Sequence, residues 1–239
     1  MKEEAWPFIV GIHYAKRFPV FKHLFGLVEN GVLVGVVSYG PSASPQVSRS
    51  IFGGLFLDRV LELNRLVITT PTKNAASFLI GRTLSMLPKP AAVVSYADGM
   101  QGHVGYIYQA CNFIYTGSVT AHDNYYKVDG KLVHPRSLAS KGITSPAKWA
   151  RENGIEIVLS QPKPRYVYLL GGKSQLNEMR TALKWTPLPY PKGESKRYDA
   201  PNSVRETEKI CVGSLTIKTS ASQVDDGSVN LTPTLHAIC

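Results

Sequence analysis

The sequence predicts an α/β (α+β) protein built around one mixed β-sheet. Asn30 and Gly31 separate two apolar runs, 23–28 and 32–39, and this dipeptide between apolar runs is typical of a two-residue β-hairpin. Three further segments form a β-α-β unit: a strand over 60–68, a helix over 75–87 and a strand over 91–95. A connecting helix makes the two strands parallel, so the hairpin beside this unit gives a sheet of mixed direction.

The elements around this framework follow from local signals. Residues 8–14 are apolar and predict a strand, whereas residues 41–54 are rich in Ser, Pro and Gly and predict a long loop. Asn74 is a favourable N-cap for the helix that follows it, and Pro88 and Pro90 end that helix.

The second half of the chain predicts more elements of the same kinds. One face of a short helix is marked by four residues at helical spacing: Val104, Ile107, Tyr108 and Cys111. Asp129 and Gly130 lie at the centre of a second hairpin over 124–133. The remaining elements are a helix over 145–153, strands over 155–159 and 165–170, and a helix over 174–183.

Length and composition predict one main domain with a tail. The chain has 239 residues, of which 44% are hydrophobic, and we expect a single domain over 1–197. From 198 to 239 the sequence is rich in Ser, Thr, Asp, Asn and Gly, which predicts a polar tail that is partly disordered or a weak β appendage. The chain has no apolar run of about 18 residues and no signal peptide, so we expect a cytoplasmic protein without a membrane partner. The spacing of the three cysteines does not match a zinc site.

The net charge of +10 is concentrated in one third of the chain. Residues 127–197 contain 14 Lys and Arg against five Asp and Glu, whereas residues 1–126 contain ten against seven. A concentrated basic segment predicts a partner with a phosphate backbone, and a generic basic surface is the alternative. The candidate DNA-binding residues of this segment are Lys148, Arg151, Lys163, Arg165, Lys192, Lys196 and Arg197.

The segment 95–117 is where we expect chemistry. A buried strand ends in a carboxylate, Asp98, and a glycine-bounded turn then leads into a short helix with several tyrosines and His103 nearby. In open α/β sheets, ligands bind in the crevice at the carboxyl ends of the strands. Asp98 is therefore a candidate catalytic carboxylate, and the alternative is that it only caps the turn or the helix.

Three parts of the sequence resemble the Mom family of phage DNA-modification proteins: LNRL at 63–66, TKNAAS at 72–77 and the block 95–117. The likeness is collinear from His13 to Tyr126. It implies an enzyme that carbamoylmethylates adenine at N6 in double-stranded DNA and so protects the DNA from host restriction. It also implies a fold similar to GNAT acyltransferases, in which two central parallel strands splay apart around the group donor.

The resemblance also implies roles for individual residues. Asp98 is the first candidate for the base that removes the N6 proton, followed by His103 and Glu62, because a side chain of this kind must accept the proton as the new bond forms. The candidate catalytic set is completed by Asn64, Ser95 and Tyr108. The candidate substrate-binding residues, whose tyrosines offer stacking faces for an extruded base, are His13, Tyr14, Tyr39, Glu62, Arg65, Tyr96, Tyr115 and Tyr126.

The group donor is left open by the sequence. The turn over 69–74 would bind the pyrophosphate of an acyl-CoA-like donor at a helix N-terminus. The candidate cofactor-binding residues there are Thr72, Lys73, Asn74, Ser77 and Arg82. The chain lacks the glycine-rich phosphate loop of acetyl-CoA-dependent GNAT enzymes, which argues against coenzyme A. A divalent metal such as iron, held by two histidines and Asp98, is a weaker alternative.

Two other functions stay open. One is a catalytically silent GNAT-like DNA-binding protein, and the other is an N-acyltransferase acting on a small molecule or a protein. The carboxylate at the strand end favours the modification enzyme over the silent protein, because a protein that only coats DNA does not need it. A small-molecule acyltransferase would leave the basic segment 127–197 unexplained. The sequence does not specify the oligomeric state.

Overall fold

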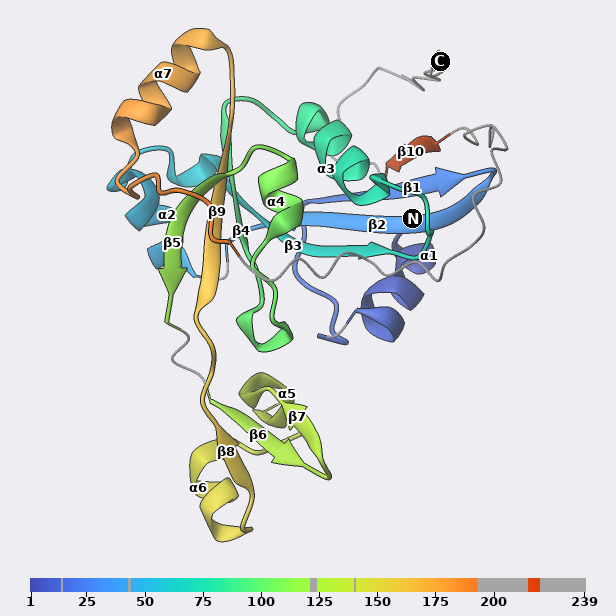
Figure 1. The fold of residues 1–239 in the computed structure, drawn as a ribbon, viewed down its shortest axis with the longest axis vertical. Coiled ribbons are helices and arrows are strands. Elements are labelled where there is room, and N and C mark those ends of the chain that lie inside the picture. Colours follow the sequence, from blue (N-terminus) through green and yellow to red (C-terminus); the bar gives the residue numbers. More distant parts are fainter. Residues whose placement is uncertain (14, 43, 121–123, 140, 193–214, 220–239) are drawn as a thin grey trace.

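The computed structural model describes residues 1–192 and 215–219, except residues 14, 43, 121–123 and 140 (Figure 1). Its main body is a seven-stranded mixed sheet in the order β10-β1-β2-β3-β4-β9-β5. The strands of this sheet are β1 (His23–Glu29), β2 (Val32–Gly40), β3 (Val60–Ile68), β4 (Ala91–Tyr96), β5 (Ile114–Val119), β9 (Lys163–Leu170) and β10 (Leu215–Thr219). The predicted α/β class with one mixed sheet is therefore confirmed.

The predicted hairpin is confirmed as β1 and β2. Asn30 and Gly31 at its turn have φ angles of 51° and 80°. A two-residue turn of this type requires left-handed backbone at both positions, and Asn and Gly adopt it at the lowest cost.

The central strands β3 and β4 are parallel, as the β-α-β unit predicts, but they pair over only a short distance. The described pairing runs from Val60 opposite Ala92 to Glu62 opposite Val94. Beyond it the strands part (Figure 1), and the Ser95 hydroxyl donates a 3.1 Å hydrogen bond to the Leu63 carbonyl. The other neighbouring strands of the sheet are antiparallel. The sheet is thus split at its centre.

Helices cover both faces of the sheet. The helices of the main body are α1 (Lys2–Trp6), the π-helix η1 (Pro7–Ile12), α2 (Pro45–Phe52), η2 (Leu57–Arg59), α3 (Ala75–Met86), η3 (Gly99–Gln101), α4 (Tyr106–Ala110) and α7 (Lys173–Ala182). On one face, Leu79 and Ile80 of α3 pack in the same cluster as Val93 of β4. On the other face, Phe52 of α2 and Met179 of α7 pack in a second cluster. The main body therefore has one hydrophobic cluster on each face of the split sheet.

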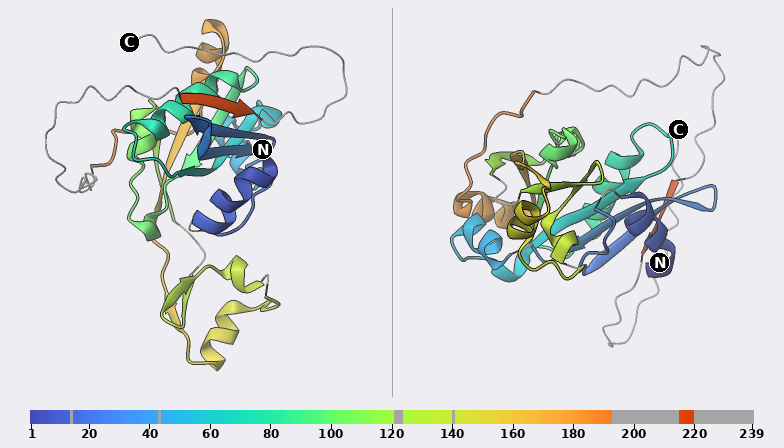
Figure 2. Two further views of the ribbon diagram at one scale, coloured as in Figure 1. Left: turned by 90° about the vertical axis from the view of Figure 1, so that its right-hand side faces the viewer. Right: turned by 90° about the horizontal axis from the view of Figure 1, so that it is seen from below.

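A small lobe projects from one end of the main body (Figures 1 and 2). It consists of β6 (Tyr125–Val128), β7 (Lys131–Val133), α5 (Pro135–Ala139), α6 (Pro146–Glu152) and β8 (Glu156–Val158), and its three strands form a sheet of their own in the order β7-β6-β8. These elements confirm the predicted second hairpin, the helix over 145–153 and the strand over 155–159. The strand and helix predicted next are confirmed as β9 and α7, which belong to the main body.

Two predictions for the first 54 residues are wrong. The strand predicted over 8–14 is not formed by residues 8–13, because Ala5 and Ile9, four residues apart, bury one face of the helices α1 and η1 against Leu24 and Val36. The β-branched residues of the predicted segment, Ile9, Val10 and Ile12, favour a strand, so the sequence did not indicate the helical spacing. Residues 41–54 are not all loop, because Pro45 occupies the first turn of α2, where proline is tolerated.

The tail contributes one edge strand to the main sheet. β10 pairs antiparallel with β1, and Ile217 packs against the core beneath α3. The other residues of the predicted tail, 198–214 and 220–239, lie outside the described residues. In the part of the chain that the structure describes, no helix is long and apolar enough to span a membrane.

Candidate active site

A β-bulge lies where β3 parts from β4. The pairing of β2 with β3 shifts by one residue between Arg65 and Leu63, which leaves Asn64 as the extra residue. Bulges bend a strand and redirect its side chains, and they are common beside active sites. The candidates Asn64 and Arg65 therefore lie at the opening of the split sheet, as the resemblance implies.

The side chains of this bulge hold the segment that precedes β1. Asn64 Oδ1 accepts from the Ser38 hydroxyl at 2.6 Å, and Asn64 Nδ2 donates to the Val20 carbonyl at 3.0 Å. Arg65 Nε and Nη2 donate to the Arg17 carbonyl at 3.4 and 3.2 Å. The sequence gives no signal for these contacts, because they join residues far apart in the chain.

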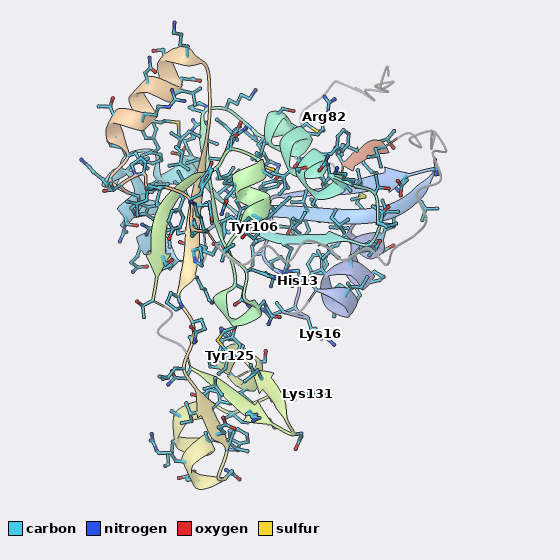
Figure 3. All side chains as sticks on the ribbon, viewed as in Figure 1. His13, Lys16, Arg82, Tyr106, Tyr125 and Lys131 are labelled. Atoms are coloured by element: carbon cyan, nitrogen blue, oxygen red, sulfur yellow. The ribbon has the colours of Figure 1, made fainter. Side chains whose placement is uncertain are left out.

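His13 follows the π-helix η1 and lies on the side of the main body nearest the small lobe (Figure 3). Its Nδ1 accepts a hydrogen bond from the Ala15 amide at 3.1 Å, so the neutral ring carries its proton on Nε2. Burial, together with the positive charges of Arg65 and His103, lowers the pKa of His13 to about 4. At neutral pH His13 is therefore an uncharged hydrogen-bond donor beside two of the other candidates.

Asp98 follows the end of β4 and is 7% exposed. Its carboxylate accepts a 3.0 Å hydrogen bond from the Met100 amide and so caps η3, as one of the two interpretations predicts. The Asp98 carbonyl accepts from the His103 amide at 3.1 Å, which folds the turn back on itself. The His103 side chain is exposed. The turn thus fixes a carboxylate at the strand end, and capping does not prevent a catalytic role.

Glu62 of β3 lies near two tyrosines that pack on opposite faces of the sheet, Tyr108 in the cluster under α3 and Tyr96 against the cluster under α2 and α7. Burial raises the pKa of Tyr96 to about 12, and the negative charge of Glu62 adds to this increase. Burial also raises the pKa of Tyr108, and Glu62 acts on it in the same direction, whereas a hydrogen bond with Ser95 opposes the increase. Both tyrosines are therefore neutral hydrogen-bond donors at physiological pH, close to Glu62.

Several predicted substrate-binding tyrosines lie away from this opening. Tyr39 is fully buried, and its hydroxyl shares a 2.7 Å hydrogen bond with Thr83 in the core. Tyr115 packs its ring against Tyr166 on the outer strands, and Tyr126 belongs to the core of the small lobe. These three serve packing in the structure, because a tyrosine ring buries a large apolar area. Tyr14 lies outside the described residues.

Ser95, from the candidate catalytic set, is fully buried. Its hydroxyl connects the parting strands by its hydrogen bond to the Leu63 carbonyl. We therefore assign Ser95 a structural role as the last connection between β3 and β4 before the opening.

The turn predicted to bind a pyrophosphate is hydrogen-bonded to a carboxylate at the end of β1, Glu29. Thr70 and Thr72 donate hydrogen bonds of 2.7 and 2.6 Å to the two oxygens of Glu29, and these bonds lower the pKa of Glu29. Lys73 and Asn74 are exposed just before α3, but Asn74 makes no side-chain cap. A carboxylate bonded to Thr72 disfavours a pyrophosphate at the same position, because the two groups carry like charges.

The other cofactor candidates contact their own helix. Ser77 Oγ donates to the Asn74 carbonyl at 3.0 Å. The Arg82 guanidinium lies 5.5 Å from the centre of the Phe78 ring, toward the end of the main body that is far from His13 (Figure 3). Both side chains therefore contact residues of α3 or its N-cap.

Some of the basic candidates are exposed to solvent, whereas Arg165 contacts other residues of the main body. Lys148 and Arg151 are exposed on α6 and line a cavity of about 500 Å³ on the small lobe. Arg165 is engaged in the main body, where it stacks 3.6 Å from the Trp185 ring and donates to Thr116 Oγ1 at 3.0 Å. Arg165 is therefore a packing residue in this structure. The sequence did not indicate this role because Trp185 and Thr116 are distant along the chain.

The remaining basic candidates are Lys163, half-exposed at the start of β9, and Lys192, exposed at the end of the described main body. Lys196 and Arg197 lie outside the described residues. Among the described residues, no group of three His, Cys, Asp or Glu side chains is close enough to hold a metal ion. A divalent metal such as iron, held by two histidines and Asp98, therefore stays a prediction from the sequence.

Comparison with known proteins places the chain in a family. The family model described as the Mom protein family matches residues 1–192. The chain is 29% identical over 189 residues to the methylcarbamoylase Mom of Escherichia phage Mu, across 75% of this chain and 76% of that protein. An N-acetyltransferase from Staphylococcus aureus Mu50 is similar in structure over 61% of this chain and 66% of its own, at 14% identity and a TM-score of 0.35. Because the family model spans the whole main body except β10, together with the small lobe, the chain belongs to the Mom protein family.

Proposed function

We propose that this protein modifies DNA by transferring a carbamoylmethyl group to N6 of adenine, which protects the DNA from restriction. The observation that carries this proposal is the split between β3 and β4, with Asp98 fixed at the end of β4 in a member of the Mom family. The phage Mu relative is named a methylcarbamoylase, and we extend that activity to this chain. A carboxylate held at a strand end has the position that a general base requires.

The proposed chemistry follows from the nature of the N6 amine. Its lone pair is delocalised into the adenine ring, so it is a weak nucleophile and gains from a base that accepts a proton as the new bond forms. Asp98 accepts that proton, while N6 bonds to the methylene carbon of the donor and the leaving group departs with its bonding electrons. Such a base contributes about 10² to 10⁴-fold to the rate.

Neutral side chains at the opening support binding of the base. Tyr96 stays protonated at physiological pH and His13 is an uncharged donor, so these two groups can donate hydrogen bonds to ring nitrogens or to the donor carbonyl, whereas Tyr108, also protonated, is buried in the core. Adenine must leave the duplex to reach them, at a cost of a few kcal/mol. We place the adenine between β3 and β4, and we leave the Glu29 turn without a pyrophosphate.

We propose that the small lobe contributes to DNA binding through its exposed basic side chains. Lys131 is exposed on β7, and Lys148 and Arg151 are exposed on α6. Lys127 and Lys148 each have an acidic partner, Glu156 at 3.0 Å and Glu152 at 3.8 Å. Ion pairs on an exposed surface contribute little, so DNA phosphates can replace these acidic partners.

The test is mass spectrometry of nucleosides from plasmid DNA isolated from bacteria that express the protein. We expect a new nucleoside with the mass of carbamoylmethylated deoxyadenosine, and a matching loss of cleavage by restriction enzymes that read adenine. The matched control is the Asp98→Asn protein at equal expression. An unmodified nucleoside profile with the wild-type protein would contradict the proposed function and would favour the silent DNA-binding alternative.

A further inference from the structure

The segment between η1 and β1 is held rigidly beside the opening of the sheet. Its two carbonyls at Arg17 and Val20 accept hydrogen bonds from Arg65 and Asn64. Farther along, the Lys22 amide donates to the Tyr39 carbonyl at 2.7 Å. Three anchors within six residues fix the path of this backbone, so its side chains are presented in defined directions.

Close packing places Val20 directly against the bulge. A Cβ atom at Gly40 would lie 2.2 Å from the Val20 carbonyl oxygen, so only glycine at that position permits the approach. Behind the segment, the Phe18 ring stacks on Trp6 with centroids 5.3 Å apart and an interplanar angle of 15°. The segment therefore rests on an aromatic support and has little freedom to move away from β3.

This segment exposes one apolar and two basic side chains. Val20 is 77% exposed, and Lys16 and Arg17, four and three residues before it, are also exposed. Lys16 has a φ of 43°, which marks a tight turn, and Figure 3 shows it on the side of the main body nearest the small lobe. An exposed apolar side chain beside two cations, on a fixed backbone, matches the composition of DNA-distorting segments that insert apolar wedges between base steps.

We propose that the segment 16–20 is the element that extrudes the target base from the duplex. Val20 enters the base stack at the place that the extruded adenine leaves, and Lys16 and Arg17 bind the phosphates beside it. Asn64 and Arg65 are positioning residues, because they hold the carbonyls of this segment and act on DNA through it. This inference rests on the proposed function only in the identity of the extruded base.

The experiment measures base unstacking and modification separately. Duplexes with 2-aminopurine in place of adenine, in every nearest-neighbour context, are mixed with the full chain, and the rise in fluorescence reports unstacking. Modification is followed by nucleoside mass spectrometry on duplexes that contain adenine and on single strands of the same sequence. The variant is Val20→Ser, and the matched control is Val32→Ser, because Val32 is 63% exposed on the β1–β2 hairpin.

We expect Val20→Ser to reduce the fluorescence rise and the rate on duplex DNA by about tenfold, with a much smaller effect on single strands, because only the duplex requires extrusion. Val32→Ser should behave as the wild-type protein does. Equal unstacking by the wild-type and Val20→Ser proteins would overturn the proposal, and so would a wild-type protein that binds the duplexes without unstacking them. Unstacking by the wild-type protein without a modified nucleoside would instead contradict the proposed function and leave the wedge supported.

Discussion

The main body and the small lobe differ in the size of their hydrophobic cores. The main body buries two extensive clusters on the two faces of its sheet, and it fixes even its polar candidates, such as Asp98 and Asn64, by hydrogen bonds. Among the described residues of the small lobe, the buried core side chains are Tyr126, Leu138 and Ala150. Its basic side chains are mostly exposed.

We propose that this difference separates chemistry from DNA binding. A reacting group must be held within a fraction of an ångström of its productive position, which requires support from a large packed body. Phosphate contacts tolerate a less rigid support, because they are electrostatic and independent of sequence. We therefore assign modification to the split sheet and much of the DNA affinity to the lobe, and the following predictions test this division.

The largest effect is expected for Asp98→Asn in the main body. The amide oxygen of Asn can still accept from the Met100 amide, so the turn and the fold should persist, but the side chain no longer accepts a proton. Modification should fall by about 10² to 10⁴-fold, while DNA affinity and the thermal unfolding midpoint stay close to those of the wild-type protein. Modified adenine at wild-type levels would show that Asp98 only caps η3.

The second prediction removes the core of the small lobe. Tyr126→Ala deletes its largest buried side chain, which should cost about 3 to 5 kcal/mol and unfold the lobe by itself. Hydrogen exchange should then increase over 124–158 and stay slow in β2, β3 and β4. The matched control is Tyr39→Phe, which keeps the ring of a fully buried tyrosine in the main body and removes only its hydroxyl. Cooperative loss of both regions in Tyr126→Ala would show that lobe and body are one folding unit.

The third prediction concerns the contribution of the lobe to DNA affinity. Lys148→Glu with Arg151→Glu reverses two exposed charges on α6, whereas Lys173→Glu with Arg180→Glu makes the same change on α7, at the opposite end of the main body (Figure 1). The α6 variant should bind duplex DNA about 10 to 100-fold more weakly, and the log-log slope against salt should decrease by about 1.8. The α7 variant should retain both values. Equal losses in the two variants would mean that total charge, and not the lobe, determines affinity.

Local signals were sufficient to predict most of the sheet. The turn at Asn30 and Gly31, and the strand-helix-strand order that follows, each depend on neighbours in the sequence, and the structure confirms both. The prediction over 8–14 is wrong because a β-branched run favours a strand, whereas Ala5 and Ile9 bury a helical face. The strand β10 was within a segment predicted as a weak β appendage, but its partner β1 was not predictable from local pattern.

The sequence predicted where candidate residues lie along the strands, but it did not predict which residues they contact. The sequence placed Asp98 at a strand end, and that location is confirmed, because it depends on the order of elements. The bond of Asn64 to Val20 and the stacking of Arg165 on Trp185 depend on long-range folding, so the sequence indicated a donor site and a DNA contact where the structure has packing and positioning. A basic residue type predicts charge, and only the fold decides whether that charge faces solvent.

The smallest expected effect is a pH dependence that belongs to the main body. The pKa of His13 is about 4 in the folded protein and 6.5 as its ordinary value, so between these pH values the unfolded chain binds more protons than the folded chain. The free energy of unfolding should therefore fall as pH decreases from 6.5 to 4, by about 1 to 2 kcal/mol after allowance for the partial exposure of the ring. His13→Asn keeps an acceptor for the Ala15 amide and removes this titration. Urea unfolding at pH 7 and pH 4 should show a smaller difference in the variant, while the contribution of His23, whose pKa burial also lowers, is the same in both proteins. Equal differences in the two proteins would mean that His13 is not held neutral by the main body.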